Sequence, residues 1–382
     1  MPCRSLGAHA IEASVSADGQ IAVFVAADAG ISNVANESPA KTFARGKADG
    51  FSVLLRNLVN GSTQRMSVPA LLSGIGSAPQ ISPSGNALVY TGPPPAGQGD
   101  PAFNAIIEVP LTKQPNGNLV LGTPRCRSCK TINADGTNSG ENSNGHSRNP
   151  TISADGRYAA WETEAKNLLV GITAPCPNAS TEIVLRDLIT GLTQRISTPP
   201  SAGQCGANGS GARKPKLDWP GGKVVFESDQ PLKPGDANAA DDVYLVDLAQ
   251  NRMTRVSETL AGTDAIGASS EPTISGDGEI VAFVSTAVNL DDGGEPDSNS
   301  RADAHVRAVD RGAAAARRLS KTRAGAEADG DSRRPVLNYN GTQLAFDSNA
   351  GNLAPGAESD VQNVFQRANP LNSLTIFSAG FD

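Results

Sequence analysis

Pro272-Thr-Ile-Ser-Gly-Asp-Gly-Glu-Ile-Val-Ala-Phe-Val-Ser285 is the stretch from which the fold can be predicted. Two apolar runs flank an Asp-Gly pair, and these two residue types accept the positive φ that tight hairpin turns require. The same cassette recurs along the chain, and the residues three before its turn glycine are Ser16, Ser82, Ser153, Asp218, Ser275 and Asn338. The six copies lie 57 to 71 residues apart, which indicates a chain of repeated units.

Two further strand-like runs follow each cassette, so every unit predicts four strands, which we call A to D. In the fourth unit the last two are residues 242–248 and 253–257. Short alternating runs joined by glycine-containing turns predict antiparallel sheets. Six such sheets around an axis make an all-β, six-bladed β-propeller. The alternative is an open stack of sheets, which would leave more sheet edges exposed.

The domain boundaries follow from the repeat. We expect an N-terminal extension at 1–11 and one propeller at 12–382. The expected blades are about 12–69, 79–122, 150–199, 215–258, 272–321 and 335–378.

The repeat can also be compared with known families. The pattern Pro-x-x-Ser-x-Asp-Gly-x-x-x-Ala-Phe, followed by Asp-Val-Tyr-Leu-x-Asp-Leu and Thr-x-Arg-Val-Ser, resembles the TolB-like (PD40, WD40-like) propeller repeat over residues 12–378. The resemblance implies the propeller fold. TolB itself carries an additional N-terminal domain, and about eleven residues precede the first cassette here. We therefore do not expect the Tol–Pal role to carry over.

The charge of the chain bounds the classes of partner. Its 382 residues carry a formal charge of −7, which argues against nucleic acid or an anionic membrane as the main partner. No apolar run reaches the ~18 residues that span a bilayer. The first residues, Met1-Pro-Cys-Arg-Ser-Leu-Gly, contain no apolar stretch typical of a signal peptide.

Loop lengths predict where a binding site lies. The A–B and C–D connections are mostly a few residues, whereas the B–C and D–A loops include 122–149, 198–214, 229–241 and 286–303. Long loops on a rigid scaffold usually carry the binding residues. We therefore expect a site on the B–C/D–A face, around the mouth of the central channel.

Basic residues end several D–A loops immediately before strand A. They are Arg148, Arg213, Lys214, Arg333 and Arg334. The B–C loops are acidic, with Asp229, Asp236, Asp241, Asp242, Asp291, Asp292, Glu295, Asp297 and Asp303. A basic inner ring within an acidic rim could focus a carboxylate- or phosphate-bearing partner. The simpler alternative is local charge pairing on solvated loops.

Two B–C loops share the spacing Asp-x-Asn-x-x-x-Asp. The residues are Asp236, Asn238 and Asp242, then Asp297, Asn299 and Asp303. Closely spaced carboxylate and amide oxygens suit Ca²⁺, which takes six to eight oxygen ligands. The alternative is that these side chains cap loop backbone amides. Calcium is the one metal cofactor that the sequence suggests.

The five cysteines indicate an oxidising compartment. Cys126-Arg-Ser-Cys129 predicts a local disulfide, and Cys176 and Cys205 fall in loops of the same face, so they form a second candidate pair. Cys3 is left over. The run Cys126-Arg-Ser-Cys-Lys130 also matches a lysine variant of the c-type haem attachment motif, but three histidines in the whole chain argue against haem. We expect a periplasmic or extracellular, bacterial protein.

No enzyme signature is present, neither a Gly-x-Ser-x-Gly elbow nor His-Glu-x-x-His. One aromatic position repeats and predicts packing between blades: Phe24, Tyr90, Trp161, Phe226, Phe283 and Phe346. Arg65, Arg195 and Arg255 of strand D are expected to pair on an outer strand. We predict a non-catalytic binding or scaffold propeller for a protein partner. The alternatives are a metal-assisted hydrolase or lactonase at the channel mouth, and a structural subunit of a larger extracellular assembly.

Overall fold

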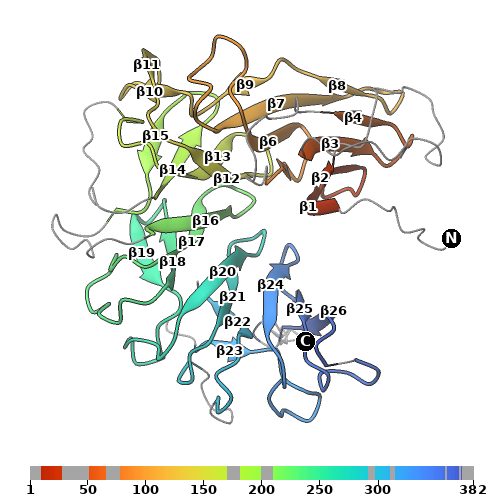
Figure 1. The fold of residues 1–382 in the computed structure, drawn as a ribbon, viewed down its shortest axis with the longest axis vertical. Coiled ribbons are helices and arrows are strands. Elements are labelled where there is room, and N and C mark those ends of the chain that lie inside the picture. The colour runs from red at the N-terminus through yellow and green to blue at the C-terminus, as the bar shows by residue number, and fades with distance from the viewer. Residues whose placement is uncertain are drawn as a thin grey trace, which may run out of the picture. The chain divides into compact units, whose positions relative to one another are not determined.

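The computed structural model describes residues 10–27, 51–65, 78–169, 181–198, 210–290, 297–309, 315–357, 359–369 and 371. All of its named elements are β-strands, and they form the blades of a six-bladed β-propeller (Figure 1). The chain divides into two compact units, Met1–Ser197 and Thr198–Asp382. Each unit contains three blades and is described by itself. Among the described residues, no helix is long and apolar enough to cross a membrane.

The first unit begins with a four-stranded blade and ends with another. The first blade consists of β1 (Ala10–Val15), β2 (Ile21–Ala27), β3 (Phe51–Asn57) and β4 (Thr63–Arg65). The second consists of β5 (Gln80–Ile81), β6 (Ala87–Gly92), β7 (Ala105–Lys113), β8 (Leu119–Leu121) and β9 (Arg125–Cys126). The third consists of β12 (Ser147–Ile152), β13 (Tyr158–Thr163), β14 (Glu182–Asp187) and β15 (Thr193–Arg195).

The second unit repeats this plan. Its blades are β16 (Ala212–Leu217), β17 (Lys223–Ser228), β18 (Asp242–Asp247) and β19 (Arg252–Arg255), then β20 (Ser269–Ile274), β21 (Ile280–Ser285), β22 (Asp303–Ala308) and β23 (Arg317–Arg318). The last blade shows β24 (Ser332–Leu337), β25 (Gln343–Ser348) and β26 (Asn363–Ala368). The strand predicted at residues 373–377 lies outside the described residues.

One segment predicted as a long loop contains strands. Within residues 122–149, β9 adds to the edge of β7, and β10 (Lys130–Ile132) pairs with β11 (Asn138–Asn142) as a separate hairpin. The loop prediction was wrong here because β11 reads Asn-Ser-Gly-Glu-Asn, which lacks the apolar alternation of a strand with a buried face. All five of its residues are exposed, so backbone pairing and not burial holds it.

The cassette folds as a capped hairpin. In the fifth blade the Ser275 hydroxyl donates to Asp277 and accepts the N–H of Ile280 at 3.0 Å. The N–H of Gly278 donates to the Ser275 carbonyl at 2.9 Å, and Gly278 has a φ of 74°. That positive φ is the reason why a glycine ends the turn. The Ser-x-Asp-Gly pattern therefore encodes the A–B turn through side-chain caps.

Apolar faces of neighbouring blades pack against each other within each unit. Ile21, Val23, Leu88 and Tyr90 belong to one buried cluster of the first unit. A second cluster of that unit surrounds Trp161. In the second unit, buried clusters around Phe283 and Phe346 join the fourth blade to the fifth and the fifth to the sixth. Five of the six repeated aromatic side chains are buried as predicted, and Phe24 is half-buried.

Candidate binding site on the inner strands

In five of the six blades the first strand carries an irregularity at the same place. The register shifts between residues 11 and 14, 148 and 151, 213 and 216, 270 and 273, and 333 and 336, which marks a β-bulge. One residue per blade adopts a left-handed conformation at this level: Glu12 (φ 54°), Ala78 (36°), Asn149 (50°), Lys214 (51°), Glu271 (52°) and Arg334 (50°). Such φ values are uncommon for residues other than glycine. A bulge re-aims side chains that would otherwise alternate between two faces.

Carboxylates from neighbouring blades hold these strained residues. In the second unit, Glu227 accepts the N–H of Glu271 at 2.8 Å, and Glu271 accepts the N–H of Arg334 at 2.7 Å. In the first unit, Glu12 accepts the N–H of Ala78 at 2.8 Å. The backbone strain costs on the order of 1–2 kcal/mol per residue, and the charge-assisted hydrogen bonds offset part of it.

The bulge of β24 places both arginines of one predicted basic pair on the surface. β16, β20 and β24 lie next to one another in the second unit (Figure 1). On β24, the side chain of Arg333 is 54% exposed and that of Arg334 is 71% exposed. In an undistorted strand the two side chains would point to opposite faces. The bulge therefore makes both arginines of this pair accessible.

Each predicted basic residue has an acidic partner. Arg334 donates from Nε and Nη2 to Asp347 at 2.9 and 2.7 Å, and Arg333 contacts Asp331 at 3.5 Å. The other ion pairs are Lys214–Glu227 (3.2 Å), Arg213–Asp241 (2.7 Å), Arg213–Glu227 (3.4 Å), Arg213–Asp229 (3.9 Å) and Arg148–Glu164 (2.6 Å). We expected the basic residues to form an inner ring and the acidic residues a separate outer rim. The two sets are not fully separate, because Asp229 and Asp241 contact Arg213 directly. Asp291, Asp292 and Glu295 lie outside the described residues.

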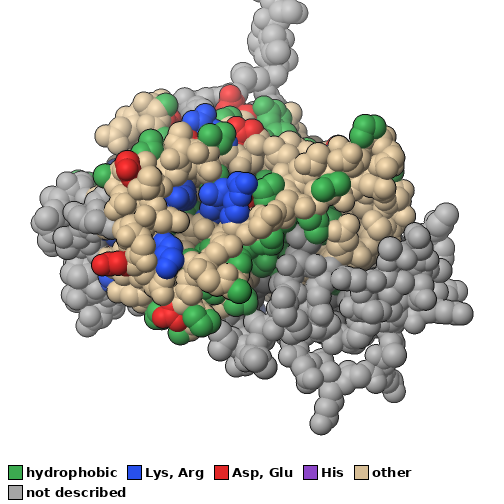
Figure 2. All heavy atoms as spheres, turned by 90° about the horizontal axis from the view of Figure 1, so that it is seen from above, with side chains coloured by type: hydrophobic (Ala, Val, Ile, Leu, Met, Phe, Trp, Pro, Cys, Tyr) green, Lys and Arg blue, Asp and Glu red, His purple; other side chains and the backbone are tan. Residues whose placement is uncertain are grey.

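Charge is unevenly distributed over the described surface. On the face drawn in Figure 2, Lys and Arg side chains gather near the middle, and Asp and Glu side chains lie toward its margin. The charged side chains are therefore not spread evenly over this face.

The two Asp-x-Asn-x-x-x-Asp loops surround buried arginines. Arg255 Nη1 lies 3.2 Å from Asp236, 3.5 Å from Asp242 and 2.5 Å from Asp264. Arg318 Nη1 lies 3.3 Å from Asp297, 3.0 Å from Asp303 and 3.5 Å from Glu327. Asn238 and Asn299 use their amides to donate to loop carbonyls, at 3.3 and 2.8 Å. Within the described part of the chain, no group of three His, Cys, Asp or Glu side chains is arranged to hold a metal. The calcium site itself stays a prediction.

Burial changes the acidity of these loops. It raises the pKa of Asp242 to about 6 and that of Asp303 to about 6, from an ordinary 3.8. It also raises the pKa of Asp236. A single guanidinium faces four carboxylates around Arg255, Glu258 at 3.8 Å included, and three around Arg318. The positive charge of the arginine therefore does not fully compensate the carboxylates for their lost hydration.

Stability is expected to increase as the pH falls from 7.5 to 5. Between pH 4 and 6 the folded state binds more protons at Asp242 and Asp303 than the unfolded chain does, so the free energy of unfolding falls as pH rises through this window. Thermal melts at the two pH values measure the effect, and Asp242→Asn should make the pH dependence shallower. Asp187→Asn is the matched control, because Arg157 holds the pKa of Asp187 at about 2. A lower melting temperature at pH 5 would contradict the prediction.

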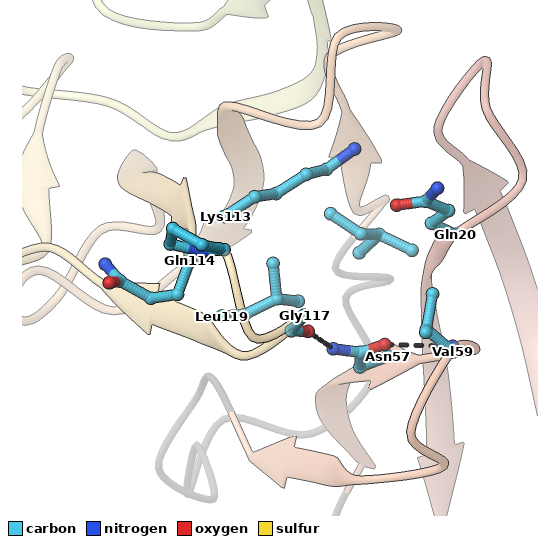
Figure 3. A pocket seen from close by; sticks show the side chains of 9 residues that line it. Gln20, Asn57, Val59, Lys113, Gln114, Gly117 and Leu119 are labelled. Atoms are coloured by element: carbon cyan, nitrogen blue, oxygen red, sulfur yellow. Dashed lines mark hydrogen bonds between the residues drawn. The ribbon is translucent and has the colours of Figure 1, made fainter.

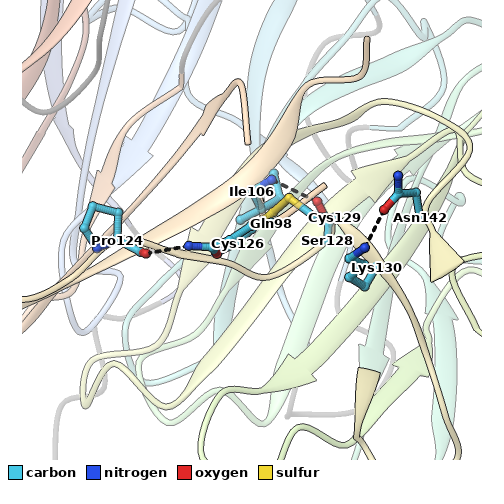
Figure 4. Close-up of a disulfide and its surroundings, with 8 residues drawn as sticks. All are labelled: Gln98, Ile106, Pro124, Cys126, Ser128, Cys129, Lys130 and Asn142. Atoms are coloured by element: carbon cyan, nitrogen blue, oxygen red, sulfur yellow. Dashed lines mark hydrogen bonds between the residues drawn. A yellow bond between two sulfur atoms is a disulfide. The ribbon is translucent and has the colours of Figure 1, made fainter. Parts of the chain in front are cut away.

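The cysteine prediction is confirmed for one pair. Cys126 and Cys129 form a disulfide with their Cα atoms 5.7 Å apart (Figure 4). Cys126 belongs to β9, and between the two cysteines the Ser128 hydroxyl accepts the N–H of Ile106 at 2.9 Å. The bridge therefore closes a tight turn that attaches β9 to the edge of the second blade. Cys3, Cys176 and Cys205 lie outside the described residues.

The first unit contains a cavity of about 360 Å³ away from the long loops (Figure 3). Gln20, Asn57 and Lys113 line it from the short turns of the first two blades. Asn57 donates to the Gly117 carbonyl at 2.7 Å and accepts the N–H of Val59 at 2.9 Å, and Lys113 pairs with Asp18. These contacts join adjacent turns, so the side chains of Asn57 and Lys113 already have partners in the protein.

Sequence reasoning missed an aromatic pair made of half-buried Trp219 and exposed Tyr339. Trp219 and Tyr339 replace the small residue that precedes the turn in four other cassettes, and their ring centroids lie 4.6 Å apart. The signal was present in the sequence, because these two cassettes are the most divergent copies.

Comparisons with known proteins agree with this architecture. No family model and no curated protein matches the chain. Among solved structures, a prolyl endopeptidase matches with a TM-score of 0.50 at 10% identity, covering 96% of this chain and 43% of that one. The β-propeller domain of the Trilobed protease from Pyrococcus furiosus matches with a TM-score of 0.46 at 10% identity, over 94% and 81% of the two chains. TolB from Acinetobacter baumannii matches with a TM-score of 0.36 at 15% identity, over 81% and 76%.

The fold places the chain in a class of proteins. The chain is a six-bladed β-propeller, and TolB structures are among the matches. At 10–15% identity the likeness is one of fold and assigns no activity to this chain.

Proposed function

We propose that this chain is a binding propeller that docks a protein partner on the face formed by its B–C and D–A loops. In this proposal the inner-strand arginines contact acidic groups of the partner. The observation that carries it is the arrangement of Arg333 and Arg334 at the bulge of β24. Arg334 uses Nε and Nη2 on Asp347, and among the described residues its Nη1 has no partner. An arginine that is fixed on one side and exposed on the other is pre-organised to bind a carboxylate.

The rest of the surroundings supports this orientation. Strained backbone conformations persist only where the neighbouring structure enforces them, and they often occur at binding sites. Here three carboxylates position the two arginines: Glu271 binds the backbone N–H of Arg334, Asp347 binds its guanidinium, and Asp331 contacts Arg333. Little side-chain entropy is then left to lose when a partner binds.

An extracytoplasmic location belongs to the same proposal. The Cys126–Cys129 disulfide supports it, because structural disulfides persist in oxidising compartments.

A labelled hexaglutamate peptide tests the site before any natural partner is known. We expect it to bind the full chain at low salt, and we expect Arg333→Ala combined with Arg334→Ala to weaken binding by about tenfold, since each charge-assisted contact contributes about 1 kcal/mol or more. Fluorescence anisotropy measures both. Binding should also fall as salt screens the charges.

The matched control also removes two positive charges, but from the outer strands of the blades. Arg252 and Arg317 are exposed arginines on the outer strands β19 and β23, and their double alanine variant should bind hexaglutamate like the unmodified chain. Equal affinity of all three proteins would refute the assignment of the site to β24.

A further inference from the structure

The ends of the inner strands opposite the long loops carry a second feature. In the second unit, three A–B turns lie in succession, and the residues at their second position are Trp219, Gly276 and Tyr339. The N–H of Trp219 donates to the Gly276 carbonyl at 3.0 Å, and the N–H of Asp277 donates to the Tyr339 carbonyl at 2.9 Å. The turns of three neighbouring blades are therefore joined into one surface.

Two aromatic rings cover the glycine in the middle. A Cβ atom at Gly276 would lie 2.4 Å from Tyr339 Cδ2 and 3.0 Å from atoms of the Trp219 ring. The rings are tilted by 56° to each other. The lack of a side chain at Gly276 allows both rings to rest on the backbone of the middle turn. We call Trp219, Tyr339 and Gly276 the aromatic platform.

The platform is accessible to solvent. Tyr339 is 53% exposed, and Val336, which precedes it on β24, is 60% exposed. Trp219 is half-buried, whereas the other tryptophan, Trp161, is completely buried. Exposed Trp and Tyr side chains that lie together are typical of binding hot spots, because each offers a large apolar area with a polar atom at its rim.

The polar atoms of the two rings define what the platform can accept. Among the described residues, neither Trp219 Nε1 nor the Tyr339 hydroxyl has a hydrogen-bond partner. The indole N–H is a donor only, and the hydroxyl can donate. The neighbouring amide oxygens are already used: Asn338 Oδ1 accepts the N–H of Gln343, and Asn340 Oδ1 accepts the N–H of Thr342. The platform therefore offers donors to a ligand that brings acceptors.

The charges nearby are of both signs. Lys223 interacts with Asp218 and donates to the Gly278 carbonyl at 2.9 Å, and Asp277 and Glu279 belong to the same turn as Gly278. Because positive and negative side chains lie close together here, their combined potential does not favour a strongly charged ligand. The surface is therefore better suited to a neutral ligand.

We propose that the aromatic platform binds a proline-rich segment of a partner protein in the polyproline II conformation. Such a segment is neutral, presents rings that stack on aromatic side chains, and has backbone carbonyls without an N–H at each proline. Aromatic surfaces with exposed donors are the way in which proline-rich peptides are recognised. A carbohydrate would also stack on the rings, and it is the alternative ligand in the test below.

A blocked decaproline peptide is the probe. Because Trp161 is buried, a change in intrinsic tryptophan fluorescence on titration reports on Trp219. We expect a saturable change with a dissociation constant below about 1 mM. Tyr339→Ala should weaken binding at least about tenfold, and Tyr339→Phe should weaken it less because the ring remains. Gly276→Ala keeps both rings but displaces them, so it should also weaken binding.

Two controls make the test decisive. Ile266→Ala, at an exposed apolar residue of the same unit, should bind decaproline like the unmodified chain. Cellohexaose should give no saturable change. Binding of cellohexaose in place of decaproline, no saturation below about 1 mM, or unchanged affinity in both Tyr339→Ala and Gly276→Ala would each overturn the proposal.

The platform is independent of the loop-face site. The arginine double variant at residues 333 and 334 should keep decaproline binding, and Tyr339→Ala should keep hexaglutamate binding. Failure of one proposal is therefore distinguishable from failure of the other.

Discussion

Replacement of Arg255 by leucine is expected to lower the free energy of unfolding by about 3–5 kcal/mol, because the change leaves buried carboxylates without their counter-charge. Arg255 is buried on β19, within 3.5 Å of Asp236, Asp242 and Asp264. Leucine could fill part of the space of the arginine side chain, but it supplies neither charge nor donors. Chemical denaturation monitored by circular dichroism measures the difference.

The control for this prediction lies on the same strand. Arg252 begins β19 and is exposed, so Arg252→Leu should change the free energy of unfolding by no more than about 0.5 kcal/mol. Arg255→Lys should fall between the two, because lysine keeps the charge but cannot bridge several carboxylates with a planar group. If Arg252→Leu and Arg255→Leu had the same free energy of unfolding, the buried arginine would not stabilise the blade, and the prediction would be wrong.

Trp161→Ala is expected to destabilise the first unit by about 3–5 kcal/mol, the usual cost of removing a large buried ring. Trp161 is completely buried at the centre of its cluster, and among the described residues its Nε1 has no hydrogen-bond partner. Trp161→Phe should therefore cost much less than the alanine variant, because it keeps most of the packing and removes an unpaired donor. Thermal and urea melts of the three proteins give the order.

Phe24 provides the comparison within the repeat. It occupies the same cassette position as Trp161 but is only half-buried. Phe24→Ala should accordingly cost less than Trp161→Ala, since the cost follows the apolar area that was removed from water. A larger effect at Phe24 would mean that the two positions are not equivalent in the core.

The candidate site was only partly predictable. The sequence predicted Arg333 and Arg334 in the loop before strand A, whereas the structure places both within β24 (Ser332–Leu337). The bulge that exposes them depends on pairing between β24 and β25. Likewise, the acidic spacing around Asp242 suggested a cation, and the structure places the guanidinium of Arg255 there. Arg255 is thirteen residues away in the sequence, and β18 and β19 bring the two side chains together.

The sequence by itself determined the repeat, the four-stranded plan of the blades, the A–B turns and the buried aromatic position. These features depend on local chemistry, namely turn glycines, side-chain caps and period-two alternation, which act over a few residues. Only the tertiary structure decided which charges pair, which residues adopt a left-handed conformation, and that Trp219 and Tyr339 meet over Gly276. The left-handed residues and the aromatic contact depend on neighbouring blades, whose partners are some sixty residues apart in the chain. Charge pairs such as Arg255–Asp242 form instead between strands of one blade.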